Sequence, residues 1–285
     1  MTTHTHQTAP TQYVDAGSIR VAYRRFGKRV GVPLVFNMHF LGTMDHWDPA
    51  ITDALAEDRE VILFDNAGIS SSSGEVPTSV EAMAGHAADF VDALGLELVD
   101  VFGFSLGGMV AQELVVQRPK LVRRLILAGT GPRGGEGMAT GVTPEAQASL
   151  SIEYSEPDQL WMNAFFTQSQ ASQTAARAYL DRIHARTINR DPPVSERVAP
   201  AQLEALVKWG APRKGSFDYL KRIGQPTLVV DGTKDVDIYT INSFILAQNL
   251  PNAQLILYPD ANHGSHNQYP ELFVAHVNLF LNGQA

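Results

Sequence analysis

Short apolar segments alternate with amphipathic segments along this 285-residue chain, and this alternation restricts the fold more than any other feature. We expect strands at residues 13–15, 19–26, 33–38, 60–65, 98–102, 124–128, 227–230 and 255–258. We expect helices at 47–57, 80–94, 107–117, 239–249 and 274–281. Continuously apolar strands are buried on both faces, which is typical of parallel sheets between helices. The sequence therefore predicts an α/β fold whose mostly parallel eight-stranded sheet is flanked by helices.

One long interval interrupts this alternation. Between residues 129 and 227 the chain has no convincing strand pattern, and a glycine-rich stretch is followed by helical patterns at 158–167, 172–187 and 201–209. We therefore expect a helical lid at 131–212, inserted into a core formed by 11–130 and 213–285. The Thr- and His-rich residues 1–10 contain no apolar stretch and are expected to form a flexible tail.

Composition and charge exclude several classes of function. The chain has no cysteine, which removes disulfides, thiolate metal sites and thiol nucleophiles, and no metal site is expected elsewhere. The formal net charge of −8 argues against nucleic acid and anionic membranes as partners, so we expect a small-molecule substrate. The sequence is compatible with a homo-oligomer. A short basic run is expected to be solvated: Arg24, Arg25, Lys28 and Arg29.

The sequence lacks the signals that direct a chain to a membrane or to a dinucleotide. The chain has neither a signal-like N-terminal segment nor a run of about 18 apolar residues, which favours the cytoplasm. Residues 129–134 match G-x-G-x-x-G after a strand, but Pro132 and the following glycines do not begin a helix. A dinucleotide is therefore not expected, and we predict chemistry without a cofactor.

The most informative motif is Gly103-Phe104-Ser105-Leu106-Gly107, a G-x-S-x-G pattern at the junction of a strand and a helix. A serine at such a turn has a strained backbone and presents its hydroxyl outside the sheet. The flanking glycines leave space that a Cβ would fill, and the N-terminus of the helix favours a developing oxyanion. We predict that Ser105 is a nucleophile. The alternative is that these small residues only pack the strand against the helix.

A serine nucleophile needs a base within hydrogen-bonding reach. Of the nine histidines, His263 lies on a loop directly after the last strand, at the sheet edge where sites of open α/β folds assemble. His266 is its rival, whereas His276 falls within the final helix and is expected on a helix face. We predict His263 as the base.

The base in turn needs an orienting carboxylate, and three aspartates follow the strand at 227–230. The turn at 232–235 carries Asp235 past the sheet edge toward the histidine loop. Asp231 is expected to end the strand or cap the turn, and Asp237 is expected to be solvated. With Asp235 as the orienting acid, the chain order is serine, aspartate, histidine, which differs from the orders of the two main serine-protease folds.

With these motifs the chain resembles the α/β-hydrolase superfamily over nearly its whole length. Beside the serine motif, the resemblance is carried by G-x-x-D at 232–235, by His263 with Pro270 after it, and by D-x-x-G at 65–68. The resemblance implies that residues 131–212 are a lid. It also implies that an oxyanion hole is formed by two backbone N–H groups, those of Phe40 and Leu106.

Two positions depart from the pattern of that family. Phe40 replaces the usual glycine after His39, and Asn262 replaces the glycine before His263. Because the oxyanion donor is a backbone N–H, Phe40 can still supply it. The Phe40 side chain is expected to narrow the acyl pocket.

Aromatic and apolar side chains near the motif and in the lid predict a hydrophobic pocket lined by Met44, Phe104, Trp161, Phe165 and Trp209. The alternative is that most of these form the core of the lid. The predicted function is a serine hydrolase, a carboxylic ester hydrolase acting through an acyl-enzyme on a small or medium hydrophobic ester or lactone. Alternatives are a cofactor-free perhydrolase of haloperoxidase type, a carbon–carbon bond hydrolase, and, in another class, a lid-gated ligand sensor.

Overall fold

The computed structural model describes residues 4–156 and 158–283, and these contain one eight-stranded sheet. The strands are β1 (Gln12–Ala16), β2 (Ile19–Gly27), β3 (Leu34–Asn37), β4 (Glu60–Phe64), β5 (Val99–Phe104), β6 (Val122–Ala128), β7 (Thr227–Gly232) and β8 (Ala253–Tyr258). Their order is β1-β2-β4-β3-β5-β6-β7-β8. β2 is antiparallel to both β1 and β4, and the remaining neighbours are parallel. The predicted fold class is confirmed.

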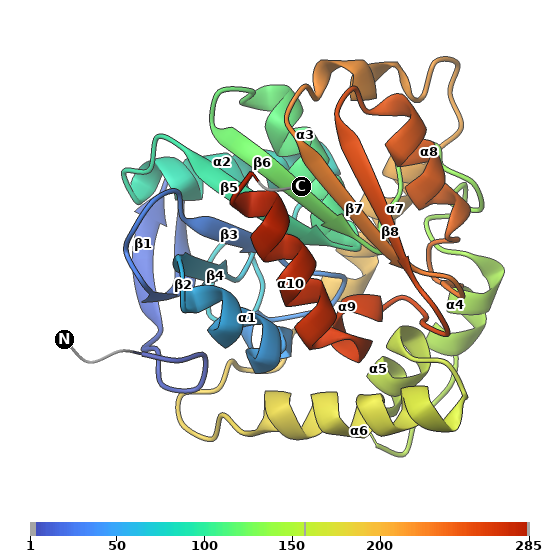
Figure 1. Ribbon diagram of the computed structural model, residues 1–285, viewed down its shortest axis with the longest axis horizontal. Coiled ribbons are helices and arrows are strands. Elements are labelled where there is room, and N and C mark those ends of the chain that lie inside the picture. Colours follow the sequence, from blue (N-terminus) through green and yellow to red (C-terminus); the bar gives the residue numbers. More distant parts are fainter. Residues whose placement is uncertain (1–3, 157, 284–285) are drawn as a thin grey trace.

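Helices cover both faces of this sheet, as Figure 1 shows. They are α1 (Pro49–Ala56), α2 (Val80–Ala93), α3 (Leu106–Gln117), α4 (Pro144–Leu150), α5 (Asp158–Phe165), α6 (Gln170–His184), α7 (Val198–Gly210), α8 (Ile241–Asn249), α9 (Ser265–Gln268) and α10 (Pro270–Leu281), with short 3₁₀ helices η1 (Met44–His46) and η2 (Asp218–Arg222). Helices α1 and α10 pack on one face, and α2, α3 and α8 pack on the other.

The central strands contain continuous apolar runs because each face of the sheet has its own buried core. Along β6, Leu125 and Leu127 belong to the core beneath α2 and α3, whereas Ile126 and Ala128 belong to the core beneath α1 and α10. Successive side chains of a strand point to opposite faces, so the part of a strand that is covered on both sides is apolar at consecutive positions. This is the physical basis of the runs seen in the sequence.

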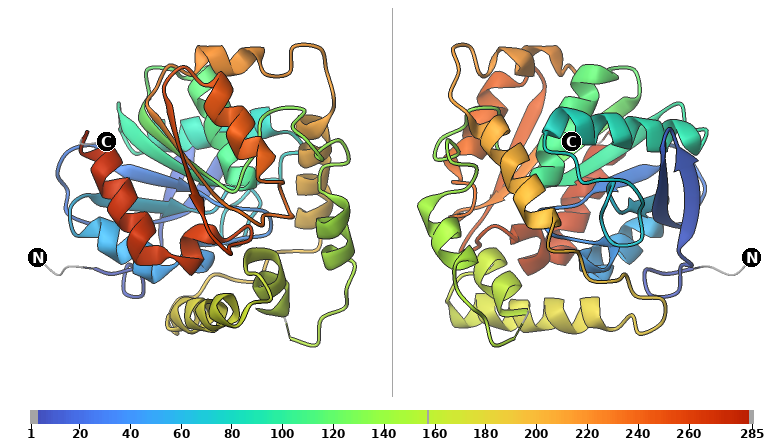
Figure 2. Two further views of the ribbon diagram at one scale, coloured as in Figure 1. Left: turned by 45° about the vertical axis from the view of Figure 1, so that its right-hand side comes forward. Right: turned by 180° about the vertical axis from the view of Figure 1, so that it is seen from behind.

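Helices α4 to α7 occupy the interval between β6 and β7, and we call residues 131–212 the cap. Figure 2 shows α5 and α6 at one end of the molecule, beyond the core. The expected helices at 158–167, 172–187 and 201–209 correspond to α5, α6 and α7. Helix α4 was not expected, although Thr143 caps it by accepting a hydrogen bond from the Ala146 N–H at 3.1 Å. That this cap opens and closes as a lid stays a prediction.

The described part of residues 1–10 does not form a free tail. The side chain of His6 is buried, and its backbone N–H donates to an Asp53 carboxylate oxygen at 2.6 Å. Arg186, two residues after the end of α6, donates to the carbonyl oxygens of His6, Gln7 and Ala9 at 2.8–2.9 Å. The expectation of a flexible tail fails here because a buried guanidinium from a distant segment satisfies these carbonyl groups.

A buried ion-pair network links the first hairpin to the cap. Arg24, expected to be solvated, is fully buried and contacts Asp45 at 2.5 Å and Asp191 at 2.6 Å. The Asp191 N–H donates to Asp45 at 2.7 Å, and the Asp45 N–H donates to Asp191 at 3.1 Å. Burial, together with the negative charge of Asp45, raises the pKa of Asp191 to about 6, and the positive charge of Arg24 opposes this rise. The network therefore holds η1, which contains Asp45, against the part of the cap between α6 and α7, which contains Asp191.

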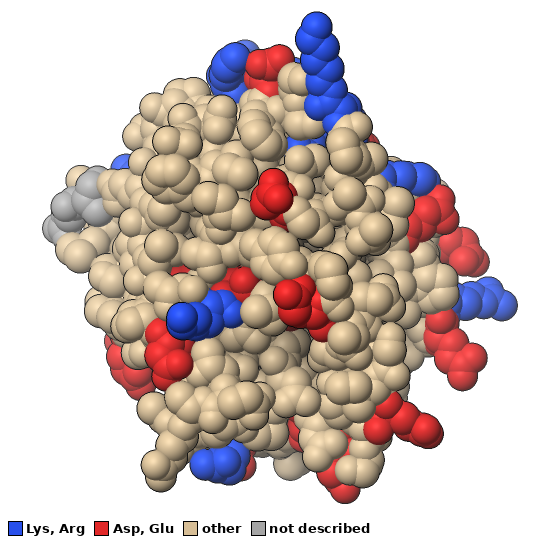
Figure 3. Space-filling model, turned by 90° about the vertical axis from the view of Figure 1, so that its right-hand side faces the viewer, with Lys and Arg blue, Asp and Glu red and all other residues tan. Residues whose placement is uncertain are grey.

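On the side of the molecule where the cap lies, charged side chains do not form a large patch. In Figure 3, Lys, Arg, Asp and Glu side chains are scattered over a mainly uncharged face. None of the helices within the described ranges is long and apolar enough to cross a membrane.

The contacts of Arg186 generate a testable prediction about the N-terminal segment. Replacing Arg186 by Ala should lower the free energy of unfolding by about 1–3 kcal/mol, because three buried carbonyl groups lose their donor. Urea denaturation measures this loss, and hydrogen exchange should show faster exchange at the Thr8 and Ala9 amides. The control is Arg177→Ala, which removes an exposed arginine of the cap. Unchanged protection of residues 5–9 in Arg186→Ala would contradict the prediction.

Candidate active site

Ser105 stands at a sharp turn between β5 and α3. Its backbone has a φ of 56°, which lies in the left-handed region that non-glycine residues rarely adopt. A Cβ at Gly103 would collide with the Gly107 carbonyl oxygen, and one at Gly107 would collide with the Asn37 carbonyl oxygen. The turn is held by a hydrogen bond from the Ser105 N–H to the Ala128 carbonyl at 2.9 Å. The two glycines of the motif are therefore required by close backbone approach.

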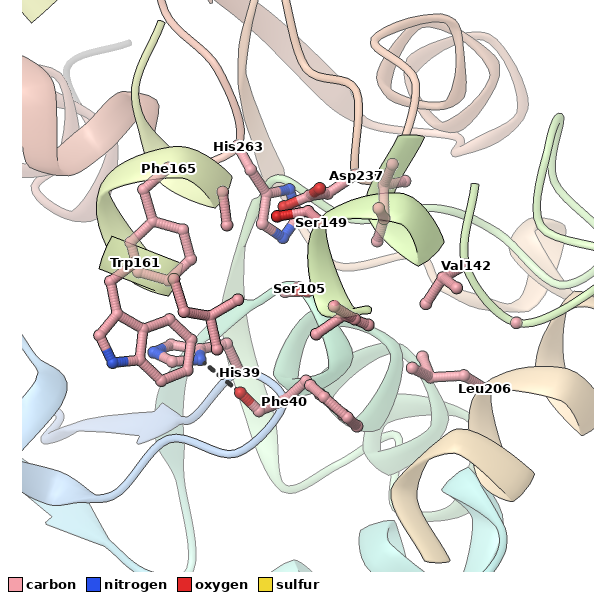
Figure 4. Close-up of a pocket in the computed structure, with 16 residues that line it drawn as sticks. His39, Phe40, Ser105, Val142, Ser149, Trp161, Phe165, Leu206, Asp237 and His263 are labelled. Carbon is pink, nitrogen blue, oxygen red and sulfur yellow. Dashed lines mark hydrogen bonds between the residues drawn. The ribbon is translucent and has the colours of Figure 1, made fainter. Parts of the chain in front are cut away.

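Asp235 and His263 meet at the same edge of the sheet. The His263 Nδ1 lies 2.7 Å from an Asp235 carboxylate oxygen, and both side chains are buried. The other oxygen of Asp235 accepts the N–H groups of Asp237 and Ile238 at 2.8 and 2.9 Å. Burial raises the pKa of Asp235, while these backbone donors lower it. With Nδ1–H donating to Asp235, the His263 Nε2 is left as an acceptor, and His263 and Ser105 line the same pocket (Figure 4).

Two backbone N–H groups near Ser105 are free to bind a ligand. Neither the Phe40 N–H nor the Leu106 N–H donates a hydrogen bond to any other described residue. The loop that carries Phe40 is fixed by its neighbours, because the His39 ring Nδ1 lies 2.8 Å from the Phe40 carbonyl oxygen. The next residue, Leu41, has a φ of 60° and donates its N–H to the Gln202 side chain at 2.8 Å. Since Gln202 lies on α7, the cap holds this loop.

The cap also contacts the histidine loop. The Gly264 N–H donates to the Phe165 carbonyl at the end of α5 at 3.0 Å. Asn262, which replaces the glycine of the family pattern, accepts the Val236 N–H at 3.0 Å and donates to the Asn163 carbonyl at 3.3 Å. The Asn262 side chain therefore links three segments: the loop after β7 that carries Asp235, the loop that carries His263, and α5.

A pocket of about 630 Å³, counted with its open mouth, contains these groups. Its walls come from the loops after β3, β5, β7 and β8 and from α4, α5 and α7. The lining residues are His39, Phe40, Ser105, Gly141, Val142, Ala146, Ser149, Leu150, Leu160, Trp161, Ala164, Phe165, Leu206, Asp237, Ile238 and His263. In Figure 4, Trp161 and Phe165 lie on one side of Ser105, and Val142 and Leu206 lie on the other. The pocket is therefore mainly apolar, with polar groups concentrated around Ser105 and His263.

Of the five side chains predicted to line a pocket, the structure places two, those of Trp161 and Phe165, around the cavity that contains Ser105, and the other three elsewhere. Met44 is fully buried in the core beneath α1 and α10. Phe104 points away from the pocket and packs against the rings of His263 and His266 at centroid distances of 5.1 and 4.4 Å. Trp209 packs on Tyr219 and donates to the Gly131 carbonyl at 3.2 Å. Each of these side chains points into a buried core because of the way its strand, loop or helix is oriented. The sequence does not reveal that orientation.

The rivals of the predicted site residues have other surroundings. His266 is buried against Phe102, Phe104 and Phe273, and burial lowers its pKa to about 3, so it stays neutral. Asp231 is fully buried and accepts the Ser243 hydroxyl at 2.7 Å. Burial and the neighbouring Asp235 raise the pKa of Asp231 well above its usual range. His266 and Asp231 therefore belong to the buried surroundings of the site and do not line the pocket.

Sequence reasoning missed two contributors to the pocket. Helix α4 supplies Ala146, Ser149 and Leu150, and the only signal for it was the Thr-Pro-Glu start at 143–145. Asp237, expected to be solvated, instead lines the pocket next to Ile238. Its side chain was indistinguishable from a surface aspartate because the direction of the loop after Asp235 has no sequence signature. Within the described ranges, no three His, Asp or Glu side chains are grouped to hold a metal ion.

Comparison with known proteins identifies the family. Residues 32–268 match the family model described as alpha/beta hydrolase fold. The chain belongs to the α/β-hydrolase family. As such it is a hydrolase, and the matched residues include strands β3 to β8 of the sheet.

Relatives of this α/β hydrolase span most of its length. It is 31% identical over 273 residues to a poly(3-hydroxyalkanoate) depolymerase of Ectopseudomonas oleovorans, covering 88% of this chain and 85% of the relative. It is 29% identical over 214 residues to a 2-hydroxymuconate semialdehyde hydrolase of Pseudomonas putida, covering 69% and 66%. The structure is similar to that of an alpha/beta hydrolase fold protein from Chitinophaga pinensis, with a TM-score of 0.91, 40% identity, and coverage of 98% and 99%.

The surroundings of His263 predict its protonation behaviour. Burial lowers the pKa of His263 below its usual value of 6.5, and the negative charges of Asp237 and Asp231 raise it in part. The imidazole should therefore stay neutral at pH 7 and take up a proton only below pH 6.5. A nitrogen-15 NMR titration, with the signal assigned by its loss in His263→Gln, measures this pKa. A value above 6.5 would contradict the prediction.

Proposed function

We propose that this α/β hydrolase is a serine hydrolase that cleaves a small or medium hydrophobic ester or lactone through an acyl-enzyme. One observation carries the proposal: the strained Ser105 shares an apolar pocket with His263, whose ring Nδ1 lies 2.7 Å from Asp235. A named relative, the depolymerase, acts on poly(3-hydroxyalkanoate), which is a polyester. That relationship supports ester chemistry at this site.

In the proposed reaction His263 takes the proton of Ser105 as the serine oxygen attacks the substrate carbonyl. The resulting oxyanion accepts hydrogen bonds from the free N–H groups of Phe40, on the loop after β3, and of Leu106, at the N-terminus of α3. Asp235 keeps the imidazole oriented and stabilises its protonated form. His263 then donates its proton to the leaving alcohol, and a water molecule, activated by the same histidine, releases the acid. No cofactor takes part in this sequence.

The serine assignment is tested by labelling and turnover. A fluorophosphonate probe should modify Ser105, and Ser105→Ala should lower kcat for p-nitrophenyl butyrate by about 10⁴-fold or more, because the nucleophile is lost. Peptide mapping by mass spectrometry locates the label. The matched control is Ser149→Ala, a second serine that lines the same pocket. Labelling at Ser149, or undiminished turnover by Ser105→Ala, would overturn the proposal.

The contact between α7 and the oxyanion loop gives a second test. Gln202→Leu removes the acceptor of the Leu41 N–H, so the Phe40 N–H should lose its fixed position. We expect kcat to fall about 10-fold with little change in KM, since the oxyanion forms only in the transition state. Steady-state kinetics with p-nitrophenyl butyrate separate the two parameters. Glu204→Leu, an exposed change on the same helix, is the control. A rise in KM alone would contradict this positioning role.

A further inference from the structure

Asp237 is the acidic side chain of the pocket to which the proposed reaction gives no role. It follows β7, two residues after Asp235, and its own N–H donates to Asp235 at 2.8 Å, which fixes its backbone. Figure 4 shows the Asp237 side chain on the same side of the pocket as His263. No described residue donates a hydrogen bond to the Asp237 carboxyl group, whereas Asp235 accepts two backbone N–H groups. The carboxyl of Asp237 therefore faces the pocket without a protein partner.

In these surroundings a hydrogen-bond donor to the Asp237 carboxyl would be stabilising. Apolar side chains line much of the same pocket, among them Val142, Leu206 and Ile238. Burial raises the pKa of Asp237 to about 7, although the residue keeps part of its surface exposed. A polar group that is desolvated without a hydrogen bond is costly, and the cost is removed when a ligand supplies the missing bond. A donor on the substrate would satisfy this carboxyl.

The position of His263 indicates which half of the substrate would reach Asp237. In acyl transfer the histidine that activates the serine also protonates the leaving oxygen, so the alcohol half lies on its side of the carbonyl. The N–H groups of Phe40 and Leu106 hold the carbonyl oxygen elsewhere in the site. Asp237 is close enough to His263 that its negative charge raises the pKa of the imidazole. The carboxyl therefore lies along the path of the leaving alcohol.

The chemistry of that alcohol is restricted by the imidazolium that forms during the reaction. A cationic group bound at Asp237 would lie near the positive charge of protonated His263, and the two would repel each other when the transition state forms. A neutral hydroxyl donates the required hydrogen bond without this penalty. The surroundings therefore favour a hydroxyl over an ammonium group.

We propose that Asp237 binds a hydroxyl on the alcohol half of the substrate, so that the preferred substrates are monoesters of diols or polyols with an apolar acid. This inference rests on the proposed serine hydrolase function. Asp237 is then a specificity residue, which distinguishes a hydroxylated leaving group from an alkyl group of the same size.

Three butyrate esters test the inference, because they share an acid and differ only in the alcohol. Propyl butyrate and 2-hydroxyethyl butyrate are matched in size, and butyrylcholine carries a cation in place of the hydroxyl. Release of butyrate by the full chain, followed by pH-stat titration, gives kcat and KM for each. We expect kcat/KM for the hydroxyethyl ester to exceed that for the propyl ester by about 10-fold or more, as for a hydrogen bond to a carboxyl group.

Variants show whether the preference comes from Asp237. Asp237→Leu should bring the ratio of hydroxyethyl to propyl ester close to one, mainly through KM, while Asp237→Asn should retain part of it because an amide also accepts the hydroxyl. Asp218→Leu removes the same charge at an exposed position and should leave the ratio unchanged. Circular dichroism confirms folding. If Asp237→Leu does not fold, the comparison of wild type with Asp237→Asn still decides.

Three results would overturn the inference. A wild-type enzyme that does not prefer the hydroxyethyl ester has no hydroxyl site. A preference for butyrylcholine that both Asp237 variants lose assigns a cation instead. An equal fall in kcat/KM for all three esters in Asp237→Leu shows that the carboxyl acts only through the charge of His263. In all three cases the wild-type enzyme still hydrolyses p-nitrophenyl butyrate in a Ser105-dependent manner, whereas absence of that activity in the wild type would refute the proposed function itself.

Discussion

The left-handed backbone of Ser105 is the constraint on which the arrangement of the site depends. At this residue β5 turns into α3, and the turn is possible because Gly103 and Gly107 carry no Cβ where other backbone atoms approach. A non-glycine residue in such a conformation costs about 1–3 kcal/mol, so the surroundings must hold it. They do so through the Ala128 carbonyl and through the Thr130 hydroxyl, which donates to the Ser105 carbonyl at 2.8 Å. The pocket assembles around this fixed point.

The parts of the molecule that could be predicted from sequence are those with a local signature. Strands buried on both faces produce continuous apolar runs, so the sheet was predictable, and its parallel order follows from the helices between strands. Ser105, Asp235 and His263 were predictable as neighbours because each lies on the turn or loop that follows a strand, and the carboxyl ends of parallel strands meet at one edge. The structure brings Asp235 and His263 together as expected, and their catalytic roles stay part of the proposed function.

The parts that could not be predicted depend on contacts between distant segments. Arg24 looked like a surface residue, and its burial is understood only when Asp45 and Asp191 meet it from other parts of the chain. The same holds for the N-terminal segment, which Arg186 fixes from across the molecule. Side-chain direction was equally inaccessible: Phe104 neighbours Ser105 in sequence yet points into a core.

The hydrogen bonds of Gln202, Phe165 and Asn262 place the cap in contact with both the oxyanion loop and the histidine loop. Inserted helical segments of hydrolases are attractive units for exchange between relatives, because they line the pocket and interrupt the core at one place. In this chain such an exchange would also remove the acceptor of the Leu41 N–H and the carbonyl groups that hold Gly264 and Asn262. A chimaera with a foreign cap must therefore carry these anchoring groups along with any new pocket wall, since substrate selection and the geometry of the reacting groups share the same helices.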